Sequence, residues 1–196
     1  MKIRTYTPAD EKGWLQCRIL AFLETAYFDN VLREKETYKY PAIELVAEVD
    51  GKIAGLIDIE YEVEEGTVCS DGSGLGGMIW HIAVHPDYSR QGIGSALLIE
   101  AEKHARMKNL NRLEAWTRDD KWVQSWYEKM GFTPVDSYYH IYFEGEEIKN
   151  HFHSTTDRLS LLSAFAHYTR ENLDPFADVK RKHQCVCYVK TLANAY

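Results

Sequence analysis

Two glycines with one residue between them, Gly92 and Gly94, mark the part of this sequence best suited to hold a phosphate. They lie in the stretch Met78–Leu98, where an apolar run is followed by a turn with a proline and by the start of a helix. The first amides of a helix lack internal hydrogen-bond partners and lie at the positive end of the helix dipole. Because glycine has no side chain, a pyrophosphate can approach this backbone closely. The pattern therefore predicts a site for a phosphorylated ligand.

Three consecutive elements must position these amides: a strand over Met78–Val84, a turn over His85–Arg90 and a helix from Gln91 to about Asn109. A Gly-x-Gly before a helix is a weak signal when it stands alone. It is not a P-loop, because no Gly-Lys-[Ser/Thr] follows, and no third glycine completes the dinucleotide fingerprint. The kind of ligand therefore has to be inferred from a second motif.

Two motifs together resemble those of the GNAT N-acetyltransferases. Ser89–Gly94 resembles motif A, [Arg/Gln]-x-x-Gly-x-[Gly/Ala], with serine in place of the first residue and Arg90 beside it as a positive charge. Trp126–Phe132 resembles the family's Tyr-x-Lys-x-Gly-Phe signature. The resemblance implies an α/β (α+β) fold, with a mixed central sheet of about seven strands, a splayed central pair of strands and flanking helices.

The resemblance also implies acetyl-CoA as co-substrate. Its acetyl group would pass to a primary amine of a small molecule or peptide by direct attack in a ternary complex. Tyr127 is then the candidate general acid, because a phenol with a pKa of about 10 is protonated at neutral pH and can serve the departing thiolate. Tyr127 also shares an apolar helical stripe with Val123 and Met130, which would bury it in any case. The alternatives are a non-catalytic acyl-CoA-binding sensor or partner-binding module, and a protein acetylase.

Coenzyme contacts follow from the same resemblance. The backbone around Ile82–Val84 would bond the pantetheine arm and polarise the thioester carbonyl, and the pyrophosphate would lie over Gln91–Ser95. Asp120 stands where many relatives carry an asparagine near the pantetheine or adenine moiety. The coenzyme-binding candidates are Ile82, Ala83, Val84, Arg90, Gln91, Gly92, Ile93, Gly94, Ser95, Asp120 and Tyr127.

The candidate general base is His81, on the same strand. Simple alternation places His81 on the face opposite Met78 and Trp80, but a bulge would exchange the faces; the alternative is a packed histidine. The candidate acceptor-substrate residues are Tyr27, Glu60 and Trp80. The alternative for Tyr27 is an ordinary packing aromatic. The alternative for Glu60 is a solvated strand face formed by Asp58, Glu60, Glu62 and Glu64.

Composition limits the other functions. The 196 residues suit one domain, and a net charge of −7 disfavours a general nucleic-acid binder. No apolar run approaches the roughly 20 residues of a membrane span, and the charged N-terminus is unlike a signal peptide, so we expect a cytoplasmic protein. No C-x-x-C is present, and His151 and His153 lack a third ligand, so no metal site is expected.

Local patterns predict most of the remaining elements. Thr7-Pro8 begins a helix to about Phe22, and a second short helix is expected within Glu24–Tyr40. Asp50-Gly51 is typical of the turn of a hairpin. A later helix, capped by Asp119 or Asp120, is predicted at Lys121–Met130. The remaining strands are predicted at Lys2–Tyr6, Ile43–Val49, Lys52–Val63, Asn111–Thr117, Thr133–Phe143 and His183–Thr191.

Residues 144–181 form an insertion that is longer than the simple turn this family often has at that point. Ser154–Asp157 is a possible helix cap, and the spacing of Leu159, Leu162, Ala166 and Tyr168 predicts a helix to about Asn172. A partner protein could dock on the insertion, and a homodimer could form through pairing of the C-terminal strand.

Overall fold

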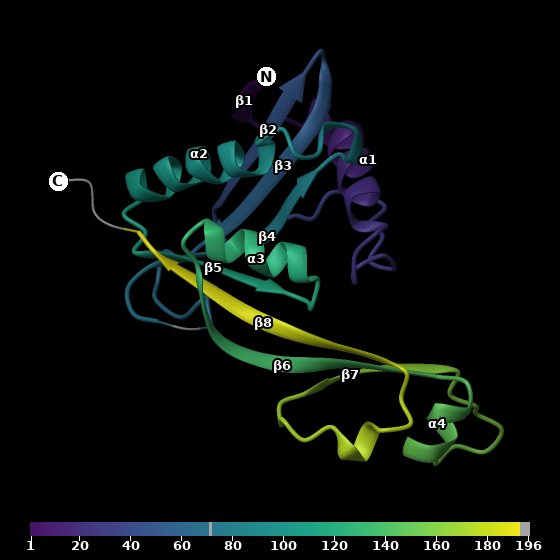
Figure 1. Cartoon of the computed structure of the whole chain (residues 1–196). Coiled ribbons are helices and arrows are strands. Elements are labelled where there is room, and N and C mark those ends of the chain that lie inside the picture. The colour runs from purple at the N-terminus through teal and green to yellow at the C-terminus, as the bar shows by residue number, and fades with distance from the viewer. Residues whose placement is uncertain (71, 193–196) are drawn as a thin grey trace.

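The computed structural model describes residues 1–70 and 72–192 and contains one large β-sheet (Figure 1). The sheet has eight strands in the order β1-β2-β3-β4-β5-β8-β6-β7. Only β4 and β5 pair in parallel among the described strands. The strands are β1 (Lys2–Thr5), β2 (Ala42–Val49), β3 (Lys52–Tyr61), β4 (Gly76–Val84), β5 (Arg112–Thr117), β6 (Thr133–Glu144), β7 (Ser163–Tyr168) and β8 (Arg181–Thr191). The helices are α1 (Glu11–Phe22), α2 (Ile93–Met107), α3 (Lys121–Lys129) and α4 (Glu146–His151).

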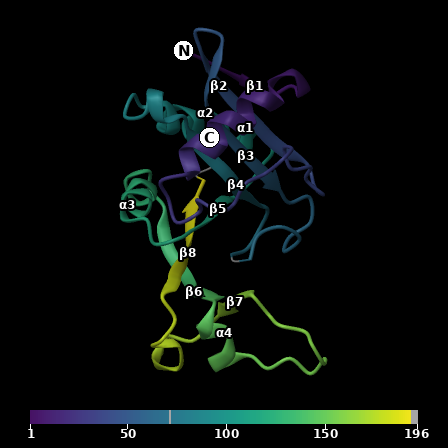
Figure 2. The same cartoon turned by 90° about the vertical axis from the view of Figure 1, so that its right-hand side faces the viewer.

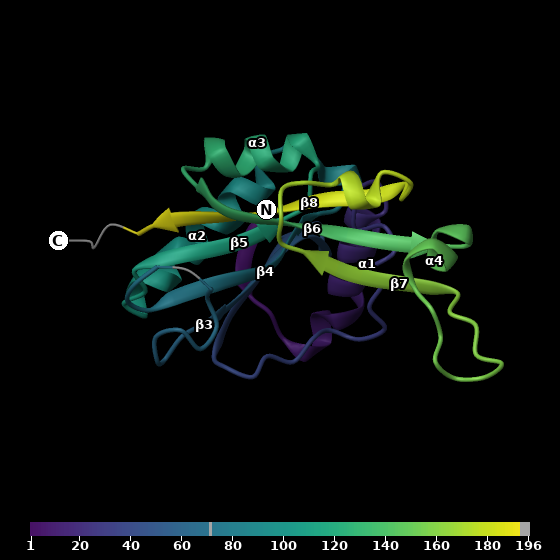
Figure 3. The same ribbon diagram turned by 90° about the horizontal axis from the view of Figure 1, so that it is seen from below.

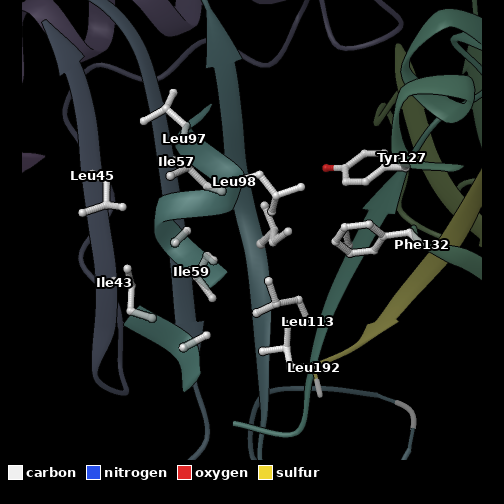
Figure 4. Close-up of a cluster of buried hydrophobic side chains, with 14 of the residues drawn as sticks. Ile43, Leu45, Ile57, Ile59, Leu97, Leu98, Leu113, Tyr127, Phe132 and Leu192 are labelled. Atoms are coloured by element: carbon white, nitrogen blue, oxygen red, sulfur yellow. The ribbon is translucent and has the colours of Figure 1, made fainter. Parts of the chain in front are cut away.

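Helices cover both faces of the sheet, because β2 and β3 carry apolar side chains on both sides (Figure 3). Leu45 and Ile57 lie in the larger core with α2 and α3, which Figure 4 shows. Val46 and Leu56, their immediate neighbours in the chain, pack against Trp14 of α1 on the opposite face. Alternation along the strands therefore separates two cores. The face covered by α1 is called the α1 face below.

The hairpin between β2 and β3 confirms the turn predicted at Asp50-Gly51. Both residues have positive φ angles, of 49° and 76°, as a two-residue hairpin turn of type I′ requires. The predicted helix within Glu24–Tyr40 is wrong, because residues 23–41 contain neither a helix nor a strand. Contacts with distant parts of the chain hold this α1–β2 segment instead, such as the bond from Arg18 Nη1 to the Asn30 carbonyl at 2.8 Å.

The insertion differs from its prediction, and so does the number of strands. The expected helix from Ser154 to Asn172 is wrong: Ser163–Tyr168 forms β7, which pairs antiparallel with β6 and makes the sheet eight-stranded rather than seven-stranded. The ends of β6 and β8 extend with β7 and α4 beyond the rest of the molecule (Figure 2). A small core of Ile141, Phe143, Ile148 and Val179 supports this arm.

β8 is paired on both sides, with β5 and with β6. The pairing with β5 covers only Val186–Thr191, so pairing of the C-terminal strand across a dimer stays a prediction. Within residues 1–70 and 72–192, no helix is long and apolar enough to cross a bilayer. In the same residues, no three side chains of the metal-binding types are placed to share an ion.

Candidate functional site

The amino end of α2 presents a backbone that is open to a ligand. Gly92 occupies the N-cap position with φ of 78°, and no side chain of the described residues caps the helix. Ala96 is the first residue of the helix whose amide has a backbone acceptor: it donates to the Gly92 carbonyl at 3.0 Å. A Cβ at Gly92 would meet nothing within 4 Å. The open space over Gly92 and the uncapped amides fit the diphosphate that the sequence predicts.

β4 and β5 separate beside this helix end, as the sequence predicted for the central pair. Their pairing stops at Ile79 and Ala115, although β4 continues to Val84. The His85 amide donates to the Ala54 carbonyl of β3 at 2.9 Å. Alternation in an antiparallel pair then turns the backbone groups of Ile82 and Val84 away from β3, into the opening. Of the three predicted residues, Ala83 instead directs its backbone toward β3.

Tyr127 of α3 lies within the larger core and is 4% exposed. Its ring stacks on Tyr188 at 5.7 Å, and its edge contacts involve Phe132 and Trp126. Figure 4 shows its hydroxyl directed toward Leu98 of α2. No described residue forms a hydrogen bond with this hydroxyl. Burial raises the pKa of Tyr127 above its ordinary value, so the phenol stays protonated at neutral pH.

A β-bulge in β4 decides where His81 lies. Asp58 of β3 pairs with His81, whereas the next residue, Ile59, pairs with Ile79, so Trp80 is the extra residue. The bulge turns His81 onto the α1 face, where its ring meets Trp14 edge-on at 5.2 Å. Simple alternation would have placed His81 on the other face.

Both nitrogens of His81 are engaged. Nδ1 accepts a hydrogen bond from Arg18 Nε at 3.3 Å, so Nε2 carries the proton and faces Glu36 Oε2 at 2.5 Å. The hydrogen bond from His81 lowers the pKa of Glu36. In this arrangement the imidazole holds two partners and has no free lone pair.

The solvated face predicted for Asp58, Glu60 and Glu62 is wrong, because these side chains are 0%, 7% and 1% exposed. Each carboxylate has hydrogen-bond partners within the protein. Glu60 accepts from the Tyr40 amide at 2.7 Å and from Trp80 Nε1 at 2.8 Å. Two of the three predicted acceptor-site residues, Glu60 and Trp80, are thus brought into direct contact. Trp80 remains 48% exposed.

Asp120 and Tyr27 join the α1–β2 segment to the start of α3. Asp120 is the N-cap residue of α3, but its carboxylate accepts from the Ala26 amide at 3.0 Å rather than capping the helix. The Tyr27 hydroxyl accepts from the Arg118 amide at 3.2 Å. Burial raises the pKa of Tyr27 above its ordinary value. The two contacts tie the α1–β2 segment to the residues that precede α3.

Sequence reasoning missed a polar cluster between Arg118 and the arm. Arg118 Nε donates to His140 Nδ1 at 3.0 Å, and its two other nitrogens bond Ala26 and Tyr142. Burial, then the charge of Arg118, lowers the pKa of His140 to about 4. The alternation of Tyr138, His140 and Tyr142 along β6 was the available signal, since polar aromatics at every second position share one face.

The comparisons with known proteins agree with this geometry. The family model described as Acetyltransferase (GNAT) domain matches residues 41–134. An acetyltransferase of Sodalis glossinidius is 31% identical over 142 residues, which is 70% of this chain and 90% of the relative. An acetyltransferase of the GNAT family from Streptococcus pneumoniae has the same fold, with a TM-score of 0.59 and 18% identity over 97% of this chain and 98% of that one.

The PaiA N-acetyltransferase of Thermoplasma acidophilum, solved in complex with coenzyme A, gives a TM-score of 0.53 at 17% identity, covering 69% of this chain and 91% of that one. The chain belongs to the GNAT acetyltransferase family. It is an acetyl-CoA-dependent N-acetyltransferase that acts on an amine, and acetyl-CoA is its co-substrate.

Proposed function

We propose that the enzyme acetylates a primary amine of a small molecule or peptide by direct attack within a ternary complex. One observation carries the proposal. The free backbone groups of Ile82 and Val84 and the uncapped amides of α2 border the same opening between β4 and β5. A thioester arm and a diphosphate are the two parts of acetyl-CoA that need such groups.

The residues that would hold acetyl-CoA divide into two groups. Amides from Gln91 to Ser95 bind the diphosphate, and Arg90, whose backbone has φ of 60°, adds a positive charge to the turn. The backbone of Ile82 and Val84 bonds the pantetheine arm and polarises the carbonyl. In our proposal Asp120 holds the α1–β2 segment rather than the coenzyme, because its carboxylate is bonded to the Ala26 amide.

The reaction itself needs one acid. The amine nitrogen attacks the thioester carbonyl, the carbon–sulfur bond breaks, and the sulfur leaves as a thiolate that takes up a proton. Tyr127 supplies that proton in our proposal, because its hydroxyl has no other hydrogen-bond partner within the described residues and burial keeps it protonated. A neutral phenol also costs less to bury beside an acyl group than a charged acid does.

The amine arrives as an ammonium ion and must lose a proton before it attacks. His81, the predicted base, holds Arg18 and Glu36 with its two nitrogens. For His81 to accept the proton, one of these contacts must open, so we propose that water carries the proton away while both remain closed. His81 as the base stays a prediction, as do the homodimer and the cytoplasmic location.

The test follows release of free CoA from acetyl-CoA with a broad panel of primary amines, and calorimetry measures coenzyme binding in parallel. We expect binding of acetyl-CoA and thiol release that depends on the amine. Binding without thiol release for every amine would contradict the proposal. Release that persists without any amine, through an acetylated protein side chain, would contradict direct attack.

A further inference from the structure

A continuous row of aromatic rings runs along the α1 face from the opening toward the arm. Trp116 of β5 bonds Glu114 through its indole nitrogen at 2.9 Å. The same ring lies 5.1 Å from that of Tyr138 on β6, which in turn contacts His140 at 5.1 Å. Glu60 and Trp80 lie on the same face at the near end.

The far end of the row gathers basic side chains, in a protein whose net charge is −7. Cross-strand pairing of β6 and β8 sets Tyr142 opposite Arg181 and His140 opposite His183. The Arg181 guanidinium stacks on the Tyr142 ring at 3.8 Å, and the His183 ring meets that same ring edge-on at 6.2 Å. The Arg181 guanidinium therefore lies over the face of the Tyr142 ring and the His183 ring lies edge-on to it, two positions apart on β8.

Arg181 has two donors that are left without a partner. It uses one nitrogen for Asp29, at 2.7 Å, while its Nε and Nη2 are buried and bond nothing in the described part of the chain. His183 bonds Asp119 through Nδ1 at 2.8 Å, and its Nε2 is buried and unpaired in the same residues; when Nδ1 carries the hydrogen of a neutral ring, Nε2 is an acceptor. A buried donor without an acceptor is costly, and native structures contain few of them. The partner that Arg181 lacks must be an acceptor of hydrogen bonds.

We propose that Arg181 binds a carboxylate of the acceptor substrate, so that this enzyme acetylates amines that also carry an anionic group. Nε and Nη2 form one edge of the guanidinium, the edge that binds a carboxylate with two parallel hydrogen bonds. The proposal rests on the proposed function and adds a substrate class to it: amino acids, or peptides with an acidic residue close to the amine.

The α1–β2 segment covers this end of the site. Phe28 lies over the Arg181 guanidinium at 4.6 Å and is 49% exposed. The neighbouring Tyr27 accepts from the Arg118 amide, which ties this part of the segment to the residues that precede α3. In our proposal the Phe28 ring must move aside for a ligand to reach Arg181.

The experiment compares amines that differ only in charge. β-Alanine, γ-aminobutyrate and phenylalanine are each assayed against their primary amides, with acetyl-CoA and thiol release as the readout. A peptide that begins Ala-Asp is assayed against one that begins Ala-Asn, which distinguishes an acidic side chain from the carboxylate of a small molecule. We expect kcat/KM for the best carboxylate to exceed that of its amide by about ten-fold to a hundred-fold. Replacing Arg181 by Met should bring the ratio close to one.

Two matched variants separate recognition from folding. Asp29→Asn removes the same ion pair as R181M but keeps the guanidinium, so the preference for the carboxylate should persist. Arg170→Met removes an exposed arginine outside the site and should change neither activity nor preference. Calorimetric titration of the CoA complex with each pair measures carboxylate binding even where turnover is absent.

The outcomes are distinct. Equal kcat/KM values for carboxylate and amide in the wild-type enzyme would overturn the proposal, and so would a preference that survives R181M. In either case, acetyl transfer to neutral amines would leave the proposed function intact. Absence of thiol release with every amine contradicts the proposed function; carboxylate binding that depends on Arg181 would still support the site.

Discussion

The variant Tyr127→Phe tests the chemistry most directly, because it removes one hydroxyl and nothing else. The ring keeps its stacking on Tyr188 and its edge contacts with Phe132 and Trp126. The hydroxyl has no hydrogen-bond partner within the described residues. We therefore expect the free energy of unfolding to change by less than about 1 kcal/mol.

Catalysis should respond far more strongly. A positioned general acid contributes about a hundred-fold or more, so we expect kcat to fall at least about 100-fold, equivalent to about 2.7 kcal/mol of transition-state stabilisation. The Kd for acetyl-CoA should stay the same, because the lost group acts on the departing sulfur. The assay combines single-turnover thiol release with calorimetric titration of acetyl-CoA and a thermal melt.

The control is Tyr188→Phe, which deletes a hydroxyl from the ring stacked on Tyr127. That hydroxyl bonds Glu128 at 3.3 Å and lies away from the proposed chemistry, so kcat should remain within about two-fold of wild type. A Tyr127→Phe enzyme with unchanged kcat, or an equal loss in both variants, would refute the assignment of the acid. Burial raises the pKa of Tyr127, so no loss of activity on this group's account is expected below pH of about 10.

Three further predictions concern coenzyme binding and acid stability. Gly92→Ala should cost about 1 kcal/mol of stability and weaken acetyl-CoA binding, whereas Gly51→Ala, with a similar φ of 76°, should cost the same stability and leave binding unchanged in calorimetry. Burial alone would raise the pKa of Glu62, but the amides of Cys69, Gly76 and Val68 outweigh it and lower the pKa, so the stability it adds is full above pH of about 4.3 and fades as the pH falls further. Amide exchange in residues 66–69 should accelerate in Glu62→Gln near neutral pH, and this difference from wild type should shrink in acid. His140 favours folding when its ring is neutral, because burial is the main cause that lowers its pKa to about 4. As the pH falls from about 6.5 to 4, thermal melts should show the wild type losing stability relative to His140→Phe, by at most about 3 kcal/mol.

Local pattern was enough for the elements that we propose to hold the coenzyme. The Asp50-Gly51 turn, the strand through Val84 and the helix that follows Gly92 each carry their own signal, and the structure contains all three. Motif spacing also placed Tyr127 on a helix beside that region. These features depend on residues close together in the chain, which is why one sequence suffices for them.

The acceptor side depends on distant contacts, and there the sequence was misread. Residues 23–41 looked helical, but the Asp120 carboxylate takes up the Ala26 amide from 94 positions away. In β3, Leu56 shares a face with Asp58 and is fully buried in the core under α1. That apolar beginning of the face was a signal that Asp58 and Glu60 would also be enclosed.

One extra residue in β4 connects the two halves of the site. Trp80 has no partner on β3, because Asp58 pairs with His81 and Ile59 with Ile79. Ile79 and His81 therefore lie on opposite faces of the sheet, and His81 reaches Arg18 and Glu36 on the α1 face. The same bulge lies directly after Ile79, where pairing with β5 ends. It thus marks the position at which backbone groups of β4 lose their partners on β5. Deleting Trp80 should therefore make the pairing of β4 with β3 regular and impair coenzyme binding while leaving His81 on the α1 face, whereas Trp80→Phe, which keeps the bulge and loses only the bond to Glu60, should spare coenzyme binding.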